Sequence, residues 1–182
     1  MKYWQLALIM ISSPVLLIGC VPMVGLGVGA GAGATGVVMS EDRRTSGTFI
    51  EDEGIELKST RRLNEQLGSK AHINVTSFNR NILLTGEVPD RASKELAEKL
   101  VMSIENVQDI ANELAVGGIS SLASRSNDAL LTTKVKGRLL TAEAVQVNHI
   151  KVITENSVVY LMGVVKRVEA NSAASVASST AG

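Results

Sequence analysis

Two stretches of equal length decide the fold: AHINVTSFNRNILLTGEV at residues 71–88 and NHIKVITENSVVYLMGVV at residues 148–165. Each places a histidine before an Ile-x-Val strand, then a polar turn, then a strand that ends in Gly-x-Val. His72 and His149 set an offset of 77 residues, and Gly86 falls on Gly163 at the same offset. A unit of this size that occurs twice indicates a duplicated domain, because a solenoid needs at least three repeats.

Each repeat predicts two helices packed on a small sheet. Apolar residues recur four apart before the first strand, which is the spacing of one helix face. Pro89-Asp90 then predicts the start of a second helix, and residues 107–114 predict a closing strand. The fold class is therefore α+β, in the order α-β-β-α-β, with both helices on one face of the sheet. The stripes of the first helices are Ile55, Ser59, Leu63 and Leu67 in one repeat and Leu131, Val135 and Leu139 in the other.

The second repeat is shorter than the first. At the offset of 77 residues, Gly182 corresponds to Glu105, so the second unit has no counterpart of the closing strand at 107–114. We therefore expect its sheet to lack the last strand and to leave an edge that is open to another chain. The expected organisation is a leader at 1–19, a tether at 20–50, a first unit at 51–117, a linker at 118–126 and a second unit at 127–182.

The leader ends at the only cysteine of the chain. An apolar run follows Lys2 and closes in Leu17-Ile18-Gly19-Cys20, too short to span a bilayer but the size of a signal-peptide core. This ending resembles the lipobox of bacterial lipoproteins. The resemblance implies a diacylglycerol on the Cys20 sulfur, cleavage just before it, and an acyl chain on its new amino group. Val21, where an Asp would retain the protein in the inner membrane, implies the outer membrane, facing the periplasm. The alternative is an ordinary free thiol.

Composition limits the other functions. The formal net charge is zero and aromatic residues make up 3%, which favours neither nucleic-acid attraction nor base stacking. Two histidines without a cysteine pair offer little for a structural metal, and we expect no metal and no cofactor besides the covalent lipid. His72 and His149 are predicted to face away from the core, and no nucleophile, base and orienting group occur together. We therefore predict that the chain is not an enzyme.

The α-β-β-α-β order with these strand motifs resembles the BON domain of bacterial envelope proteins. The lead-in at 42–48 and residues 154–156 and 160–163 are similar to those of outer-membrane lipoproteins with two BON domains. The resemblance covers nearly all of the mature chain. It implies that the second BON domain binds anionic phospholipid through its first helix and that the protein supports envelope integrity.

The first helix of the second unit carries more apolar residues than its core needs. Leu130 and Leu140 replace Gly54 and Asn64 of the first unit and lie beside basic residues, an arrangement that suits a membrane surface with anionic lipids. Alternatively, both leucines pack against the first unit, or the same surface serves a periplasmic interaction or chaperone-like module with outer-membrane protein partners. The candidate lipid-contacting residues are Leu130, Lys134, Val135, Arg138 and Leu140, of which Val135 also belongs to the core stripe.

Gly86 and Gly163 are candidate structural residues. A glycine inside a strand marks a bulge or a close approach of another backbone. We expect the neighbour in both units to be the second helix, which starts a few residues later.

Overall fold

The computed structural model describes residues 43–180, so Cys20, the leader and most of the tether lie outside the described residues. The first unit contains α2 (Ser46–Leu67), β1 (His72–Phe78), β2 (Asn81–Val88), α3 (Arg91–Met102), β3 (Asp109–Asn112) and β4 (Ala115–Val116). The second unit contains α4 (Leu122–Leu140), β5 (Ile150–Glu155), β6 (Val158–Gly163) and α5 (Arg167–Ser178).

Helix α2 follows the predicted stripe but is longer than expected. Its buried residues include Ile55, Ser59 and Leu63, in agreement with the four-residue spacing. The helix begins at Ser46, ahead of the expected start near Glu51, because the hydroxyl of Thr45 caps it by accepting a hydrogen bond from the backbone N–H of Thr48. Helix α4 likewise begins within the residues expected to be linker, at Leu122.

The first sheet is built on a tight hairpin. Strands β1 and β2 pair antiparallel, with His72 opposite Glu87, and the two turn residues Asn79 and Arg80 both have positive φ. Such a two-residue turn matches the natural twist of the strands. Strand β3 lies within the residues predicted to form a closing strand; it pairs parallel to β2, and β4 extends the same edge.

The second sheet is a hairpin alone. Strands β5 and β6 pair antiparallel through a turn at Asn156 and Ser157, which also have positive φ. Within residues 43–180 no third strand joins them, as the shorter second repeat predicted.

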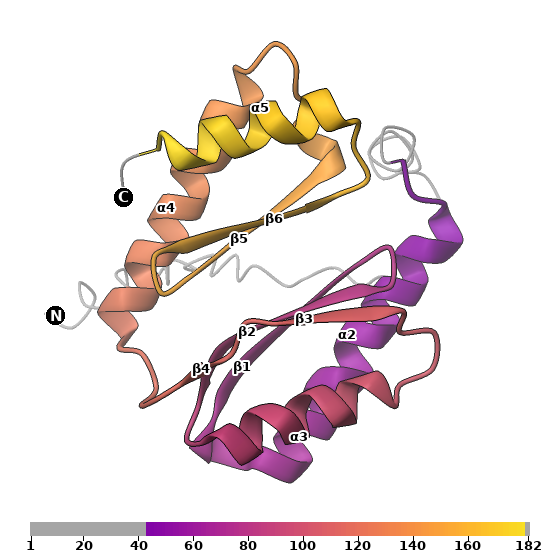
Figure 1. Ribbon diagram of the computed structural model, residues 1–182, viewed down its shortest axis with the longest axis vertical. Helices are drawn as coiled ribbons and strands as arrows, with labels where there is room; N and C mark the ends of the chain where they lie inside the picture. Colours follow the sequence, from indigo (N-terminus) through magenta and orange to yellow (C-terminus); the bar gives the residue numbers. More distant parts are fainter. Residues whose placement is uncertain (1–42, 181–182) are drawn as a thin grey trace, which may run out of the picture. The chain divides into compact units, whose positions relative to one another are not determined.

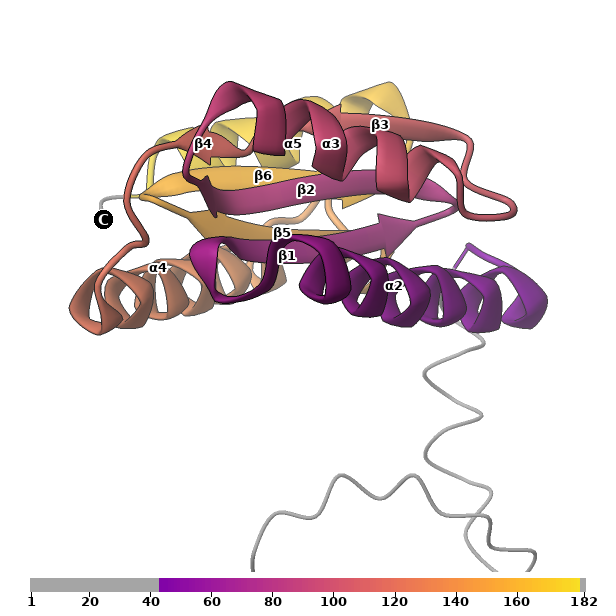
Figure 2. The same ribbon diagram turned by 90° about the horizontal axis from the view of Figure 1, so that it is seen from below.

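Each unit has its own hydrophobic core between one face of its strands and both of its helices, which confirms the α+β prediction (Figure 1). In the first unit Leu84, Val88 and Val101 are fully buried. In the second, the predicted stripe of Leu131, Val135 and Leu139 packs against β5 and α5. Figure 2 shows α2 running along β1, and α4 lies against β5 in the same way.

Candidate lipid-docking site

The turn of the first hairpin is held by a buried aspartate that sequence reasoning missed. Asp52, on α2, accepts hydrogen bonds from the backbone N–H groups of Asn79 (2.8 Å) and Arg80 (2.7 Å) and from the Ser77 hydroxyl (2.6 Å). Burial by itself raises the pKa of Asp52, but these bonds and the Arg44 guanidinium outweigh it and hold the pKa below its ordinary value. The carboxylate therefore stabilises two residues in a backbone conformation that non-glycine residues rarely adopt.

The second unit repeats this clamp with fewer bonds. Asp128, on α4, accepts from the backbone N–H groups of Asn156 (3.0 Å) and Ser157 (2.8 Å). Asp52 and Asp128 are 76 residues apart, as are Ile55 and Leu131 of the helical stripes, so the repeat contained the signal. Both carboxylates position the first helix of a unit against its hairpin.

The strand glycines are close-approach positions, but the neighbour is not the second helix. A Cβ on Gly86 would overlap the carbonyl oxygen of His72, and Gly86 has a φ of +110°. A Cβ on Gly163 would lie 2.5 Å from the carbonyl oxygen of His149. The partner strand is therefore what excludes a side chain, because Ile73 of β1 lies opposite Gly86 and Ile150 of β5 lies opposite Gly163.

The outer face of α4 exposes leucines. Leu130 is 62% exposed and Leu140 is 69% exposed, so neither packs against the first unit, and that alternative is wrong for this structure. Leu122, which sequence reasoning did not single out, is also exposed on this side of the helix. At about 100° per residue all three point away from the buried stripe. We call Leu122, Leu130 and Leu140 the leucine ridge.

The other candidate lipid-contacting residues on α4 differ in how exposed their side chains are. Val135 is 0% exposed and lies in the core. The prediction that it contacts lipid is therefore wrong, because its side chain cannot reach a membrane surface. The Arg138 guanidinium donates to the Thr180 hydroxyl at 2.9 Å, near the end of α5, and its side chain stays at the surface. Lys134 is exposed one turn from Leu130. The ridge is thus flanked by cations.

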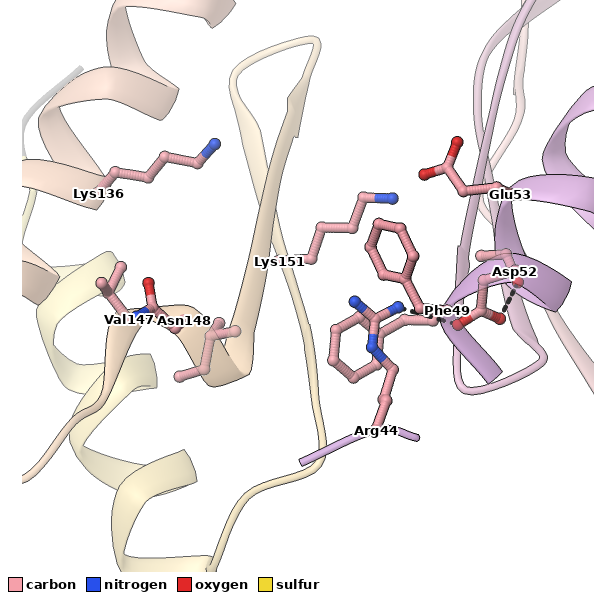
Figure 3. A pocket seen from close by; sticks show the side chains of 11 residues that line it. Arg44, Phe49, Asp52, Glu53, Lys136, Val147, Asn148 and Lys151 are labelled. Atoms are coloured by element: carbon pink, nitrogen blue, oxygen red, sulfur yellow. Dashed lines mark hydrogen bonds and ion pairs between the residues drawn. The ribbon is translucent and has the colours of Figure 1, made fainter. Parts of the chain in front are cut away.

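A pocket of about 410 Å³ lies between the two units (Figure 3). Arg44 stacks on the ring of Phe78, 4.0 Å from its centroid, and forms a 2.9 Å ion pair with Asp52. Lys151 of β5 pairs with Glu56 at 2.7 Å, and Lys136 of α4 points toward the same space. Because cations here already face carboxylates, we interpret this pocket as part of a polar contact between the units rather than as a ligand site.

The lead-in residue Arg43 also reaches the second unit. Its guanidinium forms two hydrogen bonds with the Glu169 carboxylate, at 2.7 and 2.8 Å. These bonds, with one from the backbone N–H of Lys166, lower the pKa of Glu169 to about 2. Arg43 therefore ties the segment before α2 to the first turn of α5.

The prediction that both histidines lie at the surface is wrong for His149 and holds only in part for His72. His149 is buried at the end of a short 3-10 turn, Val147–His149. His72 is partly exposed, and its Nδ1 lies 3.1 Å from a carboxylate oxygen of Glu87. The strand alternation placed both histidines off the domain core, but it could not show that the other face of each sheet is covered.

None of the helices within residues 43–180 is both long and apolar enough to cross a bilayer.

Two αββα units, each with a hairpin clamped to its first helix, define the class of this protein. The BON domain model matches residues 51–118 and again 127–182, and the chain belongs to the BON domain family. It is 36% identical to the outer membrane lipoprotein DolP of Haemophilus influenzae, over 96% of this chain and 89% of that protein.

Two further relatives match most of the chain. The 21 kDa hemolysin of Actinobacillus pleuropneumoniae is 36% identical over 78% of this chain and 74% of that protein. The osmotically-inducible protein Y of Escherichia coli is 29% identical over 75% of this chain and 70% of that protein. The resemblance to DolP thus extends over nearly the whole sequence.

Proposed function

We propose that the chain is a lipoprotein anchored through Cys20 in the outer membrane, facing the periplasm, and that its second BON domain binds anionic phospholipid. In this proposal it is a binding protein, not an enzyme, and its contact with the membrane supports envelope integrity. The leucine ridge on α4 carries the proposal. The relative DolP, an outer membrane lipoprotein by name, supports the location.

Comparison with the equivalent helix of the first unit supports the choice of α4 as the membrane-docking helix. Helix α2 also exposes apolar side chains, Ile50 and Leu57, on the side away from its core. However, α2 contains five acidic and three basic residues, a formal charge of −2, whereas α4 contains one acidic and four basic residues, a formal charge of +3. An anionic surface attracts α4 and repels α2.

The expected affinity is modest. An inserted leucine contributes about 1.5–3 kcal/mol, and each basic residue near an anionic surface about 1 kcal/mol. Binding of this strength is reversible for a soluble protein, but it becomes effective when a lipid on Cys20 already holds the chain at the bilayer.

Co-sedimentation with vesicles tests the lipid site. Residues 21–182, which lack both the apolar leader and the lipidated cysteine, should bind vesicles that contain anionic phospholipid and should bind neutral vesicles weakly. Leu130→Glu should lower the partition coefficient by roughly 10- to 100-fold, because it removes about 1.5–3 kcal/mol of apolar insertion. The substitution should leave the fold intact, since Leu130 is exposed.

Leu57→Glu on α2 is the matched control. Leu57 is 72% exposed and occupies the outer face of the equivalent helix, so it receives the same charge in a comparable setting. Vesicle binding should be unchanged in this variant. Equal losses in Leu57→Glu and Leu130→Glu, or none in either, would refute a specific role for α4 and favour the protein-interaction alternative.

Cys20→Ala tests the anchor separately. The cysteine is the only thiol in the chain, so its replacement should abolish lipid attachment and leave an unprocessed or soluble species. Metabolic labelling with a fatty acid, together with membrane fractionation, measures this directly. A Cys20→Ala protein that is still cleaved after residue 19 and stays in the membrane would contradict the lipoprotein proposal.

A further inference from the structure

Three ionisable side chains from the two units meet on the faces of the sheets that the domain cores do not use. His72 of β1 and Glu87 of β2 lie opposite each other, with 3.1 Å between Nδ1 and a carboxylate oxygen. Glu155, the last residue of β5, brings a second carboxylate from the other unit. One ligand atom of each of the three residues lies within 4.8 Å of the other two.

Both carboxylates are buried, but only Glu87 has several hydrogen-bond partners that offset the cost of burying its charge. Glu87 is 3% exposed; its burial raises the pKa, but bonds from Asn156, from the backbone and side chain of Ser120 and from His72 outweigh this and keep the pKa below its ordinary value. Glu155 is 6% exposed and accepts a hydrogen bond of 2.7 Å from the Asn74 side-chain amide. Within residues 43–180 Glu155 forms no ion pair.

Two carboxylates this close repel each other when water is excluded. A cation placed between them removes the repulsion, and an imidazole nitrogen beside both suggests which cation. Imidazole nitrogen and carboxylate oxygen together suit zinc and related transition metals better than calcium or magnesium, which prefer oxygen ligands alone.

We propose that His72, Glu87 and Glu155 bind a divalent transition-metal ion, best matched by Zn²⁺, between the two BON domains. Zinc sites with three protein ligands and one water are tetrahedral, and metal–ligand bonds of about 2.0–2.2 Å place the ligand atoms roughly 3.3 Å apart. The atoms of His72 and Glu87 are already at 3.1 Å, so only Glu155 has to move inward.

The surroundings suit such a site. His72 and Glu155 line a cavity of about 310 Å³, which has room for a water as fourth ligand. Arg125 lines the same cavity, but its guanidinium donates to the hydroxyl and the carbonyl oxygen of Ser120, both at 3.2 Å, and not to Glu155.

The two amides that hold the carboxylates cross between the units. Asn156 of the second unit donates to Glu87 of the first at 2.8 Å, and Asn74 of the first donates to Glu155 of the second. Side chains that orient metal ligands in this way typically strengthen metal binding 10- to 100-fold. A bound metal would therefore also stabilise the contact between the units. The expectation of no metal site is reversed by this proposal, because the three ligands are distributed over both repeats.

The repeat supplies a matched control. His149 occupies the position of His72 in the second unit, but Val164 stands where Glu87 would be and Phe78 where Glu155 would be. The two positions that supply carboxylates to His72 therefore supply none to His149.

Calorimetric titration with zinc chloride tests the site. The full chain with Cys20→Ser, in detergent and freed of metal by chelation, should bind one equivalent of Zn²⁺, since the thiol cannot compete. His72→Gln and Glu155→Gln should each weaken binding by more than about tenfold, as loss of a ligand exceeds loss of a supporting residue. His149→Gln should bind as the parent does. His72→Cys, which restores a zinc ligand, should recover binding that His72→Gln loses.

The NMR signals of the imidazole rings, recorded with both histidines in place, give a readout that does not depend on whether the variants fold. With two histidines present, zinc should shift the ring resonances of His72 and leave those of His149 in place. Absence of saturable zinc binding, shifts of both rings alike, or equal affinity in His72→Gln would overturn the proposal. Vesicle binding is measured separately, so failure here leaves the lipid-docking proposal untouched.

Discussion

The two BON domains share their buried parts and differ in their surfaces. Asp52 and Asp128 clamp the two hairpins in the same way, and the stripes on α2 and α4 fill equivalent cores. The two helices differ in total formal charge, −2 for α2 against +3 for α4, and only α4 exposes three leucines. The two domains thus share what folds each of them, while their exposed residues differ, and the proposed membrane docking rests on that difference.

The sheets differ as well. The first hairpin has β3 and β4 along one edge, whereas the second hairpin has no strand at the corresponding edge within residues 43–180. A two-stranded hairpin is marginal by itself and depends on its helices and on the opposite unit. The first domain should therefore be the more stable of the two, and substitutions at equivalent positions measure the difference.

The largest effect is expected at the strand glycines. Gly86→Ala should destabilise the first domain by about 3–5 kcal/mol, because a Cβ overlaps a backbone oxygen and φ is positive. Gly163→Ala lacks the positive φ and should cost the second domain less, about 1–3 kcal/mol. Urea unfolding, followed by a spectroscopic signal from each domain, measures both losses of unfolding free energy.

Gly137→Ala is the control for the glycine pair. Its Cβ would meet nothing within 4 Å on α4, so the change should raise stability by up to about 1 kcal/mol. A larger loss from Gly163→Ala than from Gly86→Ala would show that positive φ is not what distinguishes the two domains.

The aspartate clamps should show a smaller but related difference. Asp52→Ala removes the buried ion pair with Arg44 and three hydrogen bonds to the hairpin, and it should cost about 3–4 kcal/mol. Asp128→Ala removes two backbone bonds and should cost about 1–3 kcal/mol. Unfolding free energies at neutral pH compare the two variants.

The pKa of Asp52 gives this comparison a pH dependence. Because its pKa is lowered in the folded state, the unfolded chain binds a proton more readily, and stability falls as pH drops below the ordinary aspartate range near 4. Asp52→Asn should remove part of that acid dependence in the first domain. An unchanged acid unfolding curve would mean that folding does not lower the pKa of Asp52.

The smallest difference should appear in hydrogen exchange. Amides of β1 and β2 should be protected longer than those of β5 and β6, because the second hairpin lacks a third strand within the described residues. Exchange of the monomer, followed residue by residue, measures this. Equal protection would show that helix packing and the contact with the first domain compensate fully for the shorter sheet.

The sequence by itself determined the duplicated αββα order, the core stripes and the two-residue turns. These depend on local periodicity and on asparagine in the turns, which short stretches such as 71–88 express directly. The exposed position of Leu130 and Leu140 also followed from helical spacing, and the structure selected it over packing between domains.

Only the tertiary structure decided which polar residues are buried and what they meet. His149 alternates off its own core yet lies inside the protein, and the close neighbour of Gly86 is a carbonyl oxygen across the hairpin. His72, Glu87 and Glu155 come together from strands of both repeats. Periodicity reports the face on which a side chain lies, but what covers that face depends on contacts between residues far apart in the chain.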